Sequence, residues 1–596
     1  MCGIAAIFNF KSELPGVDRE ELIRIRDRMQ SRGPDASGAW FSPDNRVGLG
    51  HRRLSIIDLS EQGCQPMHSL DGTHVIVFNG EIYNYLELRE DLENSGFKFR
   101  STSDTEVLLN LFARDGAAML TKLEGMFAFG IWNTAKKQLF LARDPYGIKP
   151  LYYSVQNGVF RMASQVKAIR AGNLQTSIQP AGHAGFFLWG SVPDPFTLYK
   201  EISALPAGHY AVVDSSGLGE IRPYLKIDDI LRQIPPAFQQ AQPSLSHLRN
   251  ALEGSVRKHL VADVPVGLFL SSGLDSTTLT ALASRLHPGI QTVTLGFEEY
   301  KGTENDEVPL AELVARHYGT THRTIWITKV DFTHHYDDLM KAMDQPSTDG
   351  VNTFFVSQAA RVAGLKVALS GLGGDELFGG YPSFHQIPEM VRKIGVFNAL
   401  PSLGRGVRLL SSPLLRKFTS PKYAGLLEYG GSSAGAYLLR RGMFMPWELP
   451  EVLGPDLARE GWDALNSMAQ LQSTVEGQPN DRCLVSALES TWYMKNQLLR
   501  DSDWASMAHS LEVRVPLVDV GLLNALYPAL QGIAPFTKRD MGRCLLNSLP
   551  LEILNRPKTG FTIPVRDWLT ADRPNSRVER GLRGWTRHIY DSFLKS

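Results

Sequence analysis

The chain has 596 residues, of which 43% are hydrophobic and 21% charged, with 62 basic and 62 acidic side chains. This length exceeds what one hydrophobic core accommodates, so we expect at least two domains. The zero net charge argues against a general nucleic-acid or membrane-surface binder, and no apolar run approaches transmembrane length.

The four cysteines are scattered and form no CxxC pair, which excludes a disulfide scaffold and a zinc site of that type. Charged residues at Lys11, Glu13 and Asp18 come too early for a secretory signal peptide. We therefore expect a cytoplasmic protein whose partners include neither nucleic acid nor a membrane.

A cysteine directly follows the initiator methionine, and a short apolar run with strand character comes after it. If Met1 is removed, Cys2 carries both a thiol and a free α-amine, whose pKa of roughly 7.7–8.0 lets it act as a base near neutral pH. One residue then holds nucleophile and base, as in N-terminal nucleophile enzymes. The alternative is a small buried cysteine at the edge of a first strand.

The first half alternates short strand-like stretches with turns. A charged, amphipathic helix is predicted at residues 18–28, before a Gly-Pro turn, and a second helix at 104–114. The spacing of the remaining stretches predicts stacked antiparallel sheets with a few helices. The predicted strands lie at 47–49, 54–57, 75–78, 126–132 and 138–142.

Polar residues gather where these predicted strands end. Arg53 has a planar fork that suits a carboxylate, and the acidic Glu81 and Asp104 suit an α-ammonium. Asn79 and Gly80 offer a side-chain amide and a backbone N–H to a developing oxyanion. For any one of these residues alone, turn chemistry is the simpler interpretation, because Asn-Gly is foremost a hairpin turn.

The composition of the sequence changes between residues 204 and 243, and we interpret a Pro- and Gln-rich stretch there as a linker. The prediction is a first domain at 2–220, a linker at 221–245 and a second domain at 246–596. Beyond the linker, strand and helix patterns alternate, which predicts a doubly wound, mostly parallel sheet with a helical C-terminal part.

The centre of the second half is a predicted strand at 264–270, a hydroxyl-rich turn at 271–277 and a helix at 278–286. Unpaired N–H groups at a helix N-terminus favour an anion, and pyrophosphate is a natural occupant. Asp275 inside such an anion site requires a cation, which implies Mg²⁺. An ordinary Ser/Gly N-cap is the alternative.

A glycine-rich segment at 370–381 follows a later predicted strand, and its glycines let the backbone approach a ligand closely. Asp375 in this segment is a second candidate ligand for Mg²⁺, because two carboxylates around that ion would stabilise a leaving pyrophosphate. The further elements predicted in this half are strands at 291–297, 322–327 and 366–369 and a helix at 307–318.

The C-terminal third contains one residue whose position points to phosphate binding. Lys558 lies in a glycine-flanked turn, from which its side chain can reach phosphates. For Glu512 and Arg514 we favour a structural ion pair. We interpret residues 573–595 as a mildly basic, solvated tail.

Together these motifs resemble the glutamine-dependent asparagine synthetases: a class II glutamine amidotransferase domain followed by a synthetase domain of the ATP-pyrophosphatase type. The resemblance runs in order through both halves. It rests on the following segments: CGI at 2–4, RGPD at 32–35, HRRLSI at 51–56, NGEIYN at 79–84, SDTE at 103–106, GMFAF at 125–129, RDPYGIKP at 143–150, SSGLDST at 271–277, SGLGGDELFGGY at 370–381, the run 503–519 and RPKTGF at 556–561.

The resemblance implies an α+β first domain of the N-terminal nucleophile type, in which Cys2 attacks the glutamine amide and releases ammonia. Asn79 and Gly80 would form the oxyanion hole, and Lys558 would contact the pyrophosphate and the intermediate. The implied glutamine-binding residues are Arg53, Leu54, Ser55, Ile56, Ile57, Asn79, Gly80, Glu81 and Asp104. The implied ATP-binding residues are Leu270, Ser271, Ser272, Gly273, Asp275, Ser276, Leu295, Ser370 and Gly371, with Asp275 and Asp375 as Mg²⁺ ligands.

The substrates that the resemblance implies are glutamine, ATP and a carboxylate acceptor, with aspartate first. ATP would activate the carboxylate as an acyl-adenylate and release AMP and pyrophosphate. We expect ammonia to reach this second site through an apolar internal passage, and a homodimer is an open expectation.

Leu372 is the informative departure from the family pattern, because the family usually has Glu or Asp there. Leucine neither accepts a proton nor binds an ammonium. Either Glu376 or another group takes over that role, or the acceptor is a different carboxylate, for instance in a polysaccharide or secondary-metabolite pathway. A non-catalytic relative that binds nucleotide or glutamine is a further alternative. Ser31 and Ser272 are lesser departures, at positions where the family has His and Gly.

Overall fold

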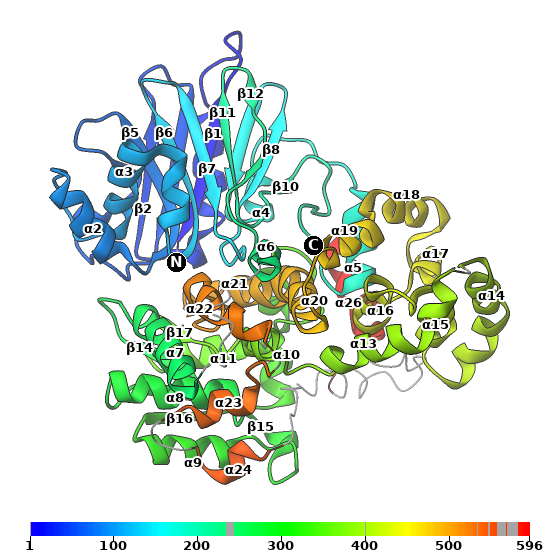
Figure 1. Cartoon of the computed structure of the whole chain (residues 1–596). Coiled ribbons are helices and arrows are strands. Elements are labelled where there is room, and N and C mark those ends of the chain that lie inside the picture. The colour runs from blue at the N-terminus through cyan, green and yellow to red at the C-terminus, as the bar shows by residue number, and fades with distance from the viewer. Residues whose placement is uncertain are drawn as a thin grey trace.

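The computed structural model describes residues 2–233, 244–399, 401–532, 534–545, 549–556, 568 and 582–595. Figure 1 shows a first part built from two stacked sheets and a second part in which helices surround another sheet. The N-terminus lies at the edge of the stacked sheets that faces the second part (Figure 1). Cys2, the second residue of the chain, therefore lies beside the boundary between the two parts.

Antiparallel strands make up the first part. Their bounds are β1 (Gly3–Asn9), β2 (Ala36–Phe41), β3 (Val47–Arg53), β4 (Met67–His68), β5 (His74–Ile82), β6 (Gly125–Asn133), β7 (Gln138–Arg143), β8 (Tyr152–Gln156), β9 (Val159–Ala163), β10 (Ser203–Ala204), β11 (His209–Asp214), β12 (Gly217–Leu218) and β13 (Arg222–Pro223). Within the described ranges, one sheet has the order β10-β8-β9-β1-β3-β2 and the other β12-β11-β7-β6-β5-β4, with β13 paired to β11.

Side-chain alternation along β1 explains why the sheets stack. Ile4 and Phe8 point into the core between the two sheets, whereas Ile7 points into a second core on the outer face. Helix α1 (Arg19–Asp27) covers that outer face, and α2 (Tyr85–Asn94) and α3 (Asp104–Asp115) cover the other sheet. The four layers confirm the predicted fold class of the first domain and both of its predicted helices.

Residues 54–57 form a loop, so the strand predicted there is wrong. β3 ends at Arg53, and the side chains of Leu54 and Ile56 pack against Val367 and Met507 of the second part. The apolar residues of this stretch are therefore explained by packing across the boundary between the two parts.

The second part is built on a parallel sheet with the order β16-β15-β14-β17-β18. Its order reverses between β14 and β17, which is the point where doubly wound sheets bind ligands at the carboxyl ends of their strands. This arrangement confirms the predicted doubly wound fold. The strands are β14 (Val266–Phe269), β15 (Gln291–Phe297), β16 (Thr321–Ile327), β17 (Val367–Leu369) and β18 (Glu512–Arg514).

Helices flank this sheet and form the predicted helical C-terminal part (Figure 1). Those around the sheet are α7 (Leu245–His259), α8 (Leu274–Leu286), α9 (Val308–Tyr318), α10 (Lys329–Ala342), α11 (Val351–Val362), α12 (Gly374–Phe378), α21 (Arg500–Met507), α22 (Val520–Leu530), α23 (Lys538–Arg543) and α24 (Leu551–Leu554). The helical part contains α13 (Ser383–Ile394), α14 (Pro401–Phe418), α15 (Leu426–Tyr429), α16 (Ser433–Arg441), α17 (Leu449–Leu453), α18 (Pro455–Leu465), α19 (Ser467–Val475), α20 (Asp481–Leu488) and a π-helical segment Glu489–Leu499. No helix among the described residues is both long and apolar enough to cross a membrane.

The C-terminus is packed, so the prediction of a solvated tail is wrong for its described residues. Helix α26 (Arg583–Lys595) lies against α5 (Pro180–Trp189) of the first half (Figure 1). The Tyr590 hydroxyl is 2.6 Å from His183 Nδ1, and Trp585 and Ile589 are buried. The sequence prediction followed the basic residues of this segment and missed its apolar helix face, which Trp585, Ile589 and Tyr590 form at helical spacing.

Ordered structure continues into the predicted linker at 221–245. Strand β13 and helix α6 (Ile227–Arg232) both lie in that range, whereas residues 234–243 are outside the described residues. The domain boundaries stay a prediction.

Candidate active sites

Cys2 directly precedes β1 and is buried, 8% exposed. Its backbone nitrogen donates to Asn79 Oδ1 at 2.9 Å, and its carbonyl oxygen accepts from Arg32 Nε at 3.0 Å. Burial raises the pKa of the thiol, so a nearby base is needed to form a thiolate. A free α-amine on the same residue would supply that base.

A narrow cavity opens beside the Cys2 thiol and brings together most of the predicted glutamine-binding residues. Its walls include Cys2, Arg53, Leu54, Ile56, Ile57, Gly80, Glu81 and Asp104. Asn79 and Ser55 are not wall residues: Asn79 Oδ1 accepts from the Cys2 N–H, and the Ser55 N–H donates to Asp35 Oδ2 at 2.8 Å. Sequence reasoning missed the wall residues Gly63, Gln65, Phe78, Ser103 and Thr105.

Arg53 is held rigidly in the cavity wall by backbone carbonyls. Its guanidinium donates to Ser60 O at 2.8 Å and to Asp58 O. A Cβ on Gly63 would lie 2.3 Å from Arg53 Nη2, so only glycine leaves room for this placement. The fixed fork is suited to binding a carboxylate with both oxygens.

Two buried carboxyl groups, those of Glu81 and Asp104, line the same cavity as this guanidinium. Burial raises the pKa of Asp104 to about 6 and holds the pKa of Glu81 well above its usual range. The Ile82 N–H donates to Asp104 Oδ2 at 3.1 Å and favours the ionised form. A ligand ammonium would offset the cost of ionising these groups, because opposite charges favour each other's charged form.

Buried ion pairs connect this cavity to the second part. Arg32, which holds the Cys2 carbonyl, also binds Asp503 of α21 at 2.6 and 3.0 Å. Glu512 and Arg514 form the predicted ion pair at 2.6 Å, and Arg514 Nη2 is 3.5 Å from Glu81 Oε2. Sequence reasoning missed the link from Arg32 to Asp503, because nothing in the sequence pairs residues so far apart.

The second candidate site lies at the switch point of the parallel sheet. Helix α8 begins at Leu274, four residues before its predicted start, so Asp275 lies in its first turn. No side chain caps this helix, and Ser271 Oγ of the preceding turn lies 2.9 Å from Ser276 Oγ in the first turn of the helix. The Ser272 hydroxyl is buried without a hydrogen-bond partner among the described residues. These donors suit an anion such as a phosphate group.

Two carboxylates from neighbouring strand ends converge beside this turn. Lys538 Nζ lies 2.5 Å from both Asp275 Oδ2 and Asp375 Oδ1. The two carboxylates outweigh the effect of burial and raise the pKa of the Lys538 ammonium. Sequence reasoning missed Lys538, although Thr537 and Asp540 form a capping box that fixes the helix carrying it.

The two carboxylates fit a hard divalent cation such as Mg²⁺, because they already share one cation and offer oxygen ligands. The described residues contain no group of three or more His, Cys, Asp or Glu placed to hold a metal. Phosphate oxygens or water would therefore have to complete the coordination.

Close packing explains the glycines of the 370–381 segment. A Cβ on Gly374 would lie 2.2 Å from Asp275 Oδ1, and one on Gly380 would lie 1.8 Å from Asp375 Oδ1. A Cβ on Gly371 would meet Asp275 Cβ at 2.8 Å. These glycines allow the two loops to approach until their carboxylates share one cation.

The other predicted ATP-binding residues lie near this point or in the core beside it. Ser370 follows β17 and donates its N–H to Arg514 O at 2.9 Å. Leu270 packs against α9 and Leu295 belongs to the main core, so both are already buried in apolar surroundings. Lys558 lies outside the described residues.

Leu372 packs against the main core, and the neighbouring Glu376 is a buried acid. The Tyr381 hydroxyl donates to Glu376 Oε1 at 2.9 Å. Burial and the nearby Asp375 raise the pKa of Glu376 to about 8, so it is mostly protonated at neutral pH. Glu376 is thus a titratable group close to the position that Leu372 leaves apolar.

Comparison with known proteins decides the family. Residues 1–225 match the model of the glutamine amidotransferase domain, and residues 247–594 match that of asparagine synthase. The chain belongs to the asparagine synthase family. This synthetase is an ATP-dependent carbon–nitrogen ligase that carries its own glutamine amidotransferase domain.

Several curated relatives of this synthetase cover much of the chain. Asparagine synthetase [glutamine-hydrolyzing] 1 of Bacillus subtilis (strain 168) is 32% identical over 99% of the chain and 90% of that protein. Asparagine synthetase B [glutamine-hydrolyzing] of Escherichia coli (strain K12) is 31% identical over 66% of the chain and 68% of its own length. A protein named Amidase chry2 from Gibberella zeae is 31% identical over 64% of the chain and 60% of its own length.

Proposed function

We propose that the chain is a glutamine-hydrolysing asparagine synthase. Cys2 would attack the side-chain amide of glutamine, with Arg53 on the α-carboxylate and Glu81 and Asp104 on the α-ammonium. Asn79 and Gly80 would donate to the oxyanion of the tetrahedral intermediate. The ammonia released would then attack aspartate activated as an acyl-adenylate at the second site.

The convergence of Asp275 and Asp375 on one cation, beside the open N-terminus of α8, carries the synthetase half of this proposal. An uncapped helix start favours the phosphates of ATP, and a carboxylate pair tolerates that position only with a cation. Asp275 and Asp375 would hold Mg²⁺, which would neutralise charge on the departing pyrophosphate. Lys538 would remain close enough to interact with the charge of the departing pyrophosphate. Lys558 remains a predicted phosphate contact.

Removal of Met1 is part of the proposal, because only then does Cys2 have a free α-amine. In the described structure the Cys2 nitrogen already points at Asn79 Oδ1, 2.9 Å away. That contact would orient the amine beside the thiol. Intact-mass measurement of the natively produced chain tests this step.

The acceptor carboxylate has two candidates. Aspartate has the support of relatives whose names specify asparagine synthesis. Leu372 favours a second candidate, the same ligase chemistry on another carboxylate, because it removes an acidic group from the site. Glu376 could supply that group for aspartate, since a ligand ammonium would lower its raised pKa.

The passage of ammonia, a cytoplasmic location and a homodimer stay predictions. The boundary between the two parts contains an apolar cluster of Leu54, Ile56, Val367 and Met507. It also contains the buried ion pair of Arg32 and Asp503. An ammonia path here would therefore pass charged groups as well as apolar ones.

Pyrophosphate release tests the proposal. Purified protein is given Mg²⁺-ATP and glutamine with aspartate, or with one of a panel of other carboxylic acids, and the amide product is identified by mass spectrometry. Pyrophosphate and asparagine in equal amounts with aspartate support the leading proposal. Pyrophosphate with a different acid and none with aspartate would establish the second candidate.

A further inference from the structure

A cavity of about 450 Å³ lies between the two parts, and its lining shares no residue with the cavity beside Cys2. Its walls come from the start of β11 and from α6 on one side. The other walls come from α19 and the π-helical segment Glu489–Leu499. Elements of both halves of the sequence therefore line this open cavity, and its volume suits a small organic molecule.

Three hydrogen-bond donors in this cavity have no protein acceptor among the described residues. The ammonium groups of Lys226 and Lys495 and the hydroxyl of Ser473 line the cavity. None of the three forms a hydrogen bond or an ion pair with another described residue. Lys226 and Ser473 are exposed, so water satisfies them, whereas Lys495 is partly buried. Two ammonium groups and a hydroxyl along one cavity can offer an anion charge-assisted hydrogen bonds.

The electrostatic surroundings also favour an anion. The charged lining residues are Lys226, Lys495 and a single acid, Asp228, which is already paired with Arg232 at 2.8 Å. Burial lowers the pKa of Lys495 although the nearby Asp194 favours its charged form, and Arg143 and Arg500 lower it further; a bound anion would add to the effect of Asp194.

His209 and Trp492 complete the cavity. His209 Nδ1 donates to Ala207 O at 2.8 Å, which leaves Nε2 as the atom able to accept or take up a proton. Trp492 is fixed by its Nε1 donating to Thr474 Oγ1 at 3.3 Å, and it gives one wall an aromatic face. An aromatic wall beside cationic groups suits an organic anion better than an inorganic ion.

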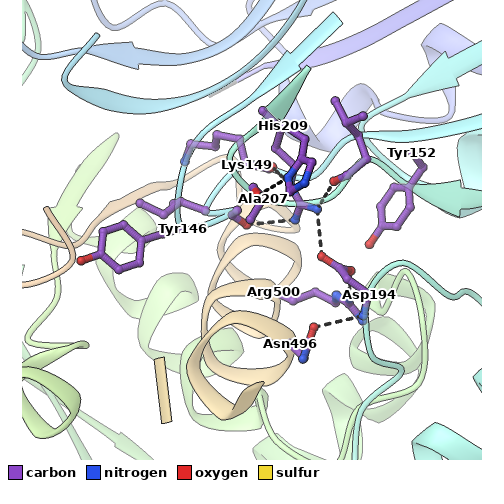
Figure 2. Close-up of polar contacts among 12 residues, drawn as sticks. Tyr146, Lys149, Tyr152, Asp194, Ala207, His209, Asn496 and Arg500 are labelled. Atoms are coloured by element: carbon purple, nitrogen blue, oxygen red, sulfur yellow. Dashed lines mark hydrogen bonds and ion pairs between the residues drawn. The ribbon is translucent and has the colours of Figure 1, made fainter. Parts of the chain in front are cut away.

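The cavity is joined to both parts by a buried polar chain, most of which Figure 2 shows. Asn496 follows Lys495 and accepts from the Asp194 N–H at 3.0 Å. Asp194 binds Arg143 at 2.9 Å as well as Arg500, and Arg143 Nε donates to Lys149 O at 2.8 Å. A ligand on Lys495 would therefore act on the segment that fixes the first part against the second.

We propose that this cavity binds a small organic polyanion with at least two carboxylate or phosphate groups, held by Lys226, Lys495 and Ser473. Such a ligand would bridge the two parts of the synthetase. The proposal does not depend on which acid the enzyme amidates.

Calorimetric titration of the full chain in metal-free buffer tests the proposal, with citrate in one arm and 3-phosphoglycerate in the other. We expect at least one probe to bind the wild-type chain, and Lys495→Met to weaken that binding at least tenfold. Methionine keeps the unbranched apolar stem of lysine and removes only its charge. Binding of citrate alone would identify carboxylates as the recognised groups, and binding of 3-phosphoglycerate alone would identify a phosphate.

Lys136→Met is the matched control, because Lys136 lies on the exposed turn after β6 and outside the cavity. As a second readout on unmodified protein, the bound probe should protect Lys226 and Lys495 from acetylation, measured by peptide mass spectrometry. The proposal is overturned if neither probe binds at millimolar concentration. It is equally overturned if Lys495→Met binds as tightly as wild type and no protection is seen. No glutamine, ATP or metal is present, so a failure here is separate from a failure of the proposed synthase activity.

Discussion

Replacing Asp503 by asparagine tests whether the second part of the molecule holds the nucleophile of the first. Asp503 binds Arg32 at 2.6 and 3.0 Å, with the side chains 6% and 0% exposed, and Arg32 Nε binds Cys2 O at 3.0 Å. Breaking a buried ion pair by removing one partner costs about 3–5 kcal/mol, because the other charge is left uncompensated. Asparagine keeps one acceptor oxygen, so we expect a loss of folding stability near the lower limit, about 3 kcal/mol.

The same substitution should impair glutamine hydrolysis, although Asp503 lies outside the glutamine cavity. Without its carboxylate partner the Arg32 guanidinium shifts, and the Cys2 carbonyl loses the donor that fixes the start of β1. We expect kcat/KM for glutamate release, measured without ATP or aspartate, to fall at least tenfold, which corresponds to about 1.4 kcal/mol of transition-state stabilisation. Asp463→Asn, at an exposed position in α18, is the control and should behave as wild type.

Asp503→Glu separates positioning from general destabilisation, since it keeps the charge but moves the carboxylate. It should recover part of the lost kcat/KM without necessarily recovering the unfolding midpoint. The reasoning would be refuted by a folded Asp503→Asn protein that hydrolyses glutamine at the wild-type rate. In that case the ion pair would stabilise the boundary without positioning Cys2.

Three further predictions concern the two sites. Cys2→Ala should abolish glutamate release and glutamine-dependent pyrophosphate release, while ammonium chloride should still support pyrophosphate release; loss of both activities would argue against a separate second site. Gly374→Ala should lower pyrophosphate release by roughly 100-fold, because the new Cβ would lie 2.2 Å from Asp275 Oδ1, yet leave glutamate release within about twofold of wild type. The KM for glutamine should rise as the pH falls through about 6, because Asp104, whose pKa is raised to about 6, becomes neutral and no longer balances the α-ammonium. Initial-rate measurements from pH 5 to 8 test this. A KM that does not change with pH would show that Asp104 does not bind the α-ammonium.

Local sequence signals predicted most of the fold. The strand predicted at 291–297 coincides with β15, because a β-branched, apolar run between turn residues has no competing interpretation. The stretch 54–57 has similar composition but pairs with no strand, since its partners are Val367 and Met507 of the other part. Propensity describes one segment at a time, and tertiary packing decided this one.

The residues of the candidate sites also fall into two groups: those that local sequence signals predict and those that only the fold brings together. Arg53, Glu81 and Asp104 could be found because each follows or opens a predicted element, so that strand geometry brings them to one edge. Lys538 could not, because a lysine at a helix start is ordinarily solvated, and only the folded chain places it between Asp275 and Asp375. The sequence identifies side chains capable of catalysis or binding, whereas the pairing of buried charges across hundreds of residues depends on the fold.

The short strand β18 gives the two sites a common support. The Arg514 carbonyl accepts from the N–H of Ser370, at the start of the glycine-rich segment that carries Asp375. Its guanidinium binds Glu512 at 2.6 Å and lies 3.5 Å from Glu81 in the glutamine cavity. A ligand ammonium beside Glu81 would compete with Arg514 for that carboxylate, whose pKa is already raised by burial and by Glu512. Glutamine binding would then act through Arg514 on the backbone of the second site, because a buried ion pair cannot lose one partner without the other adjusting.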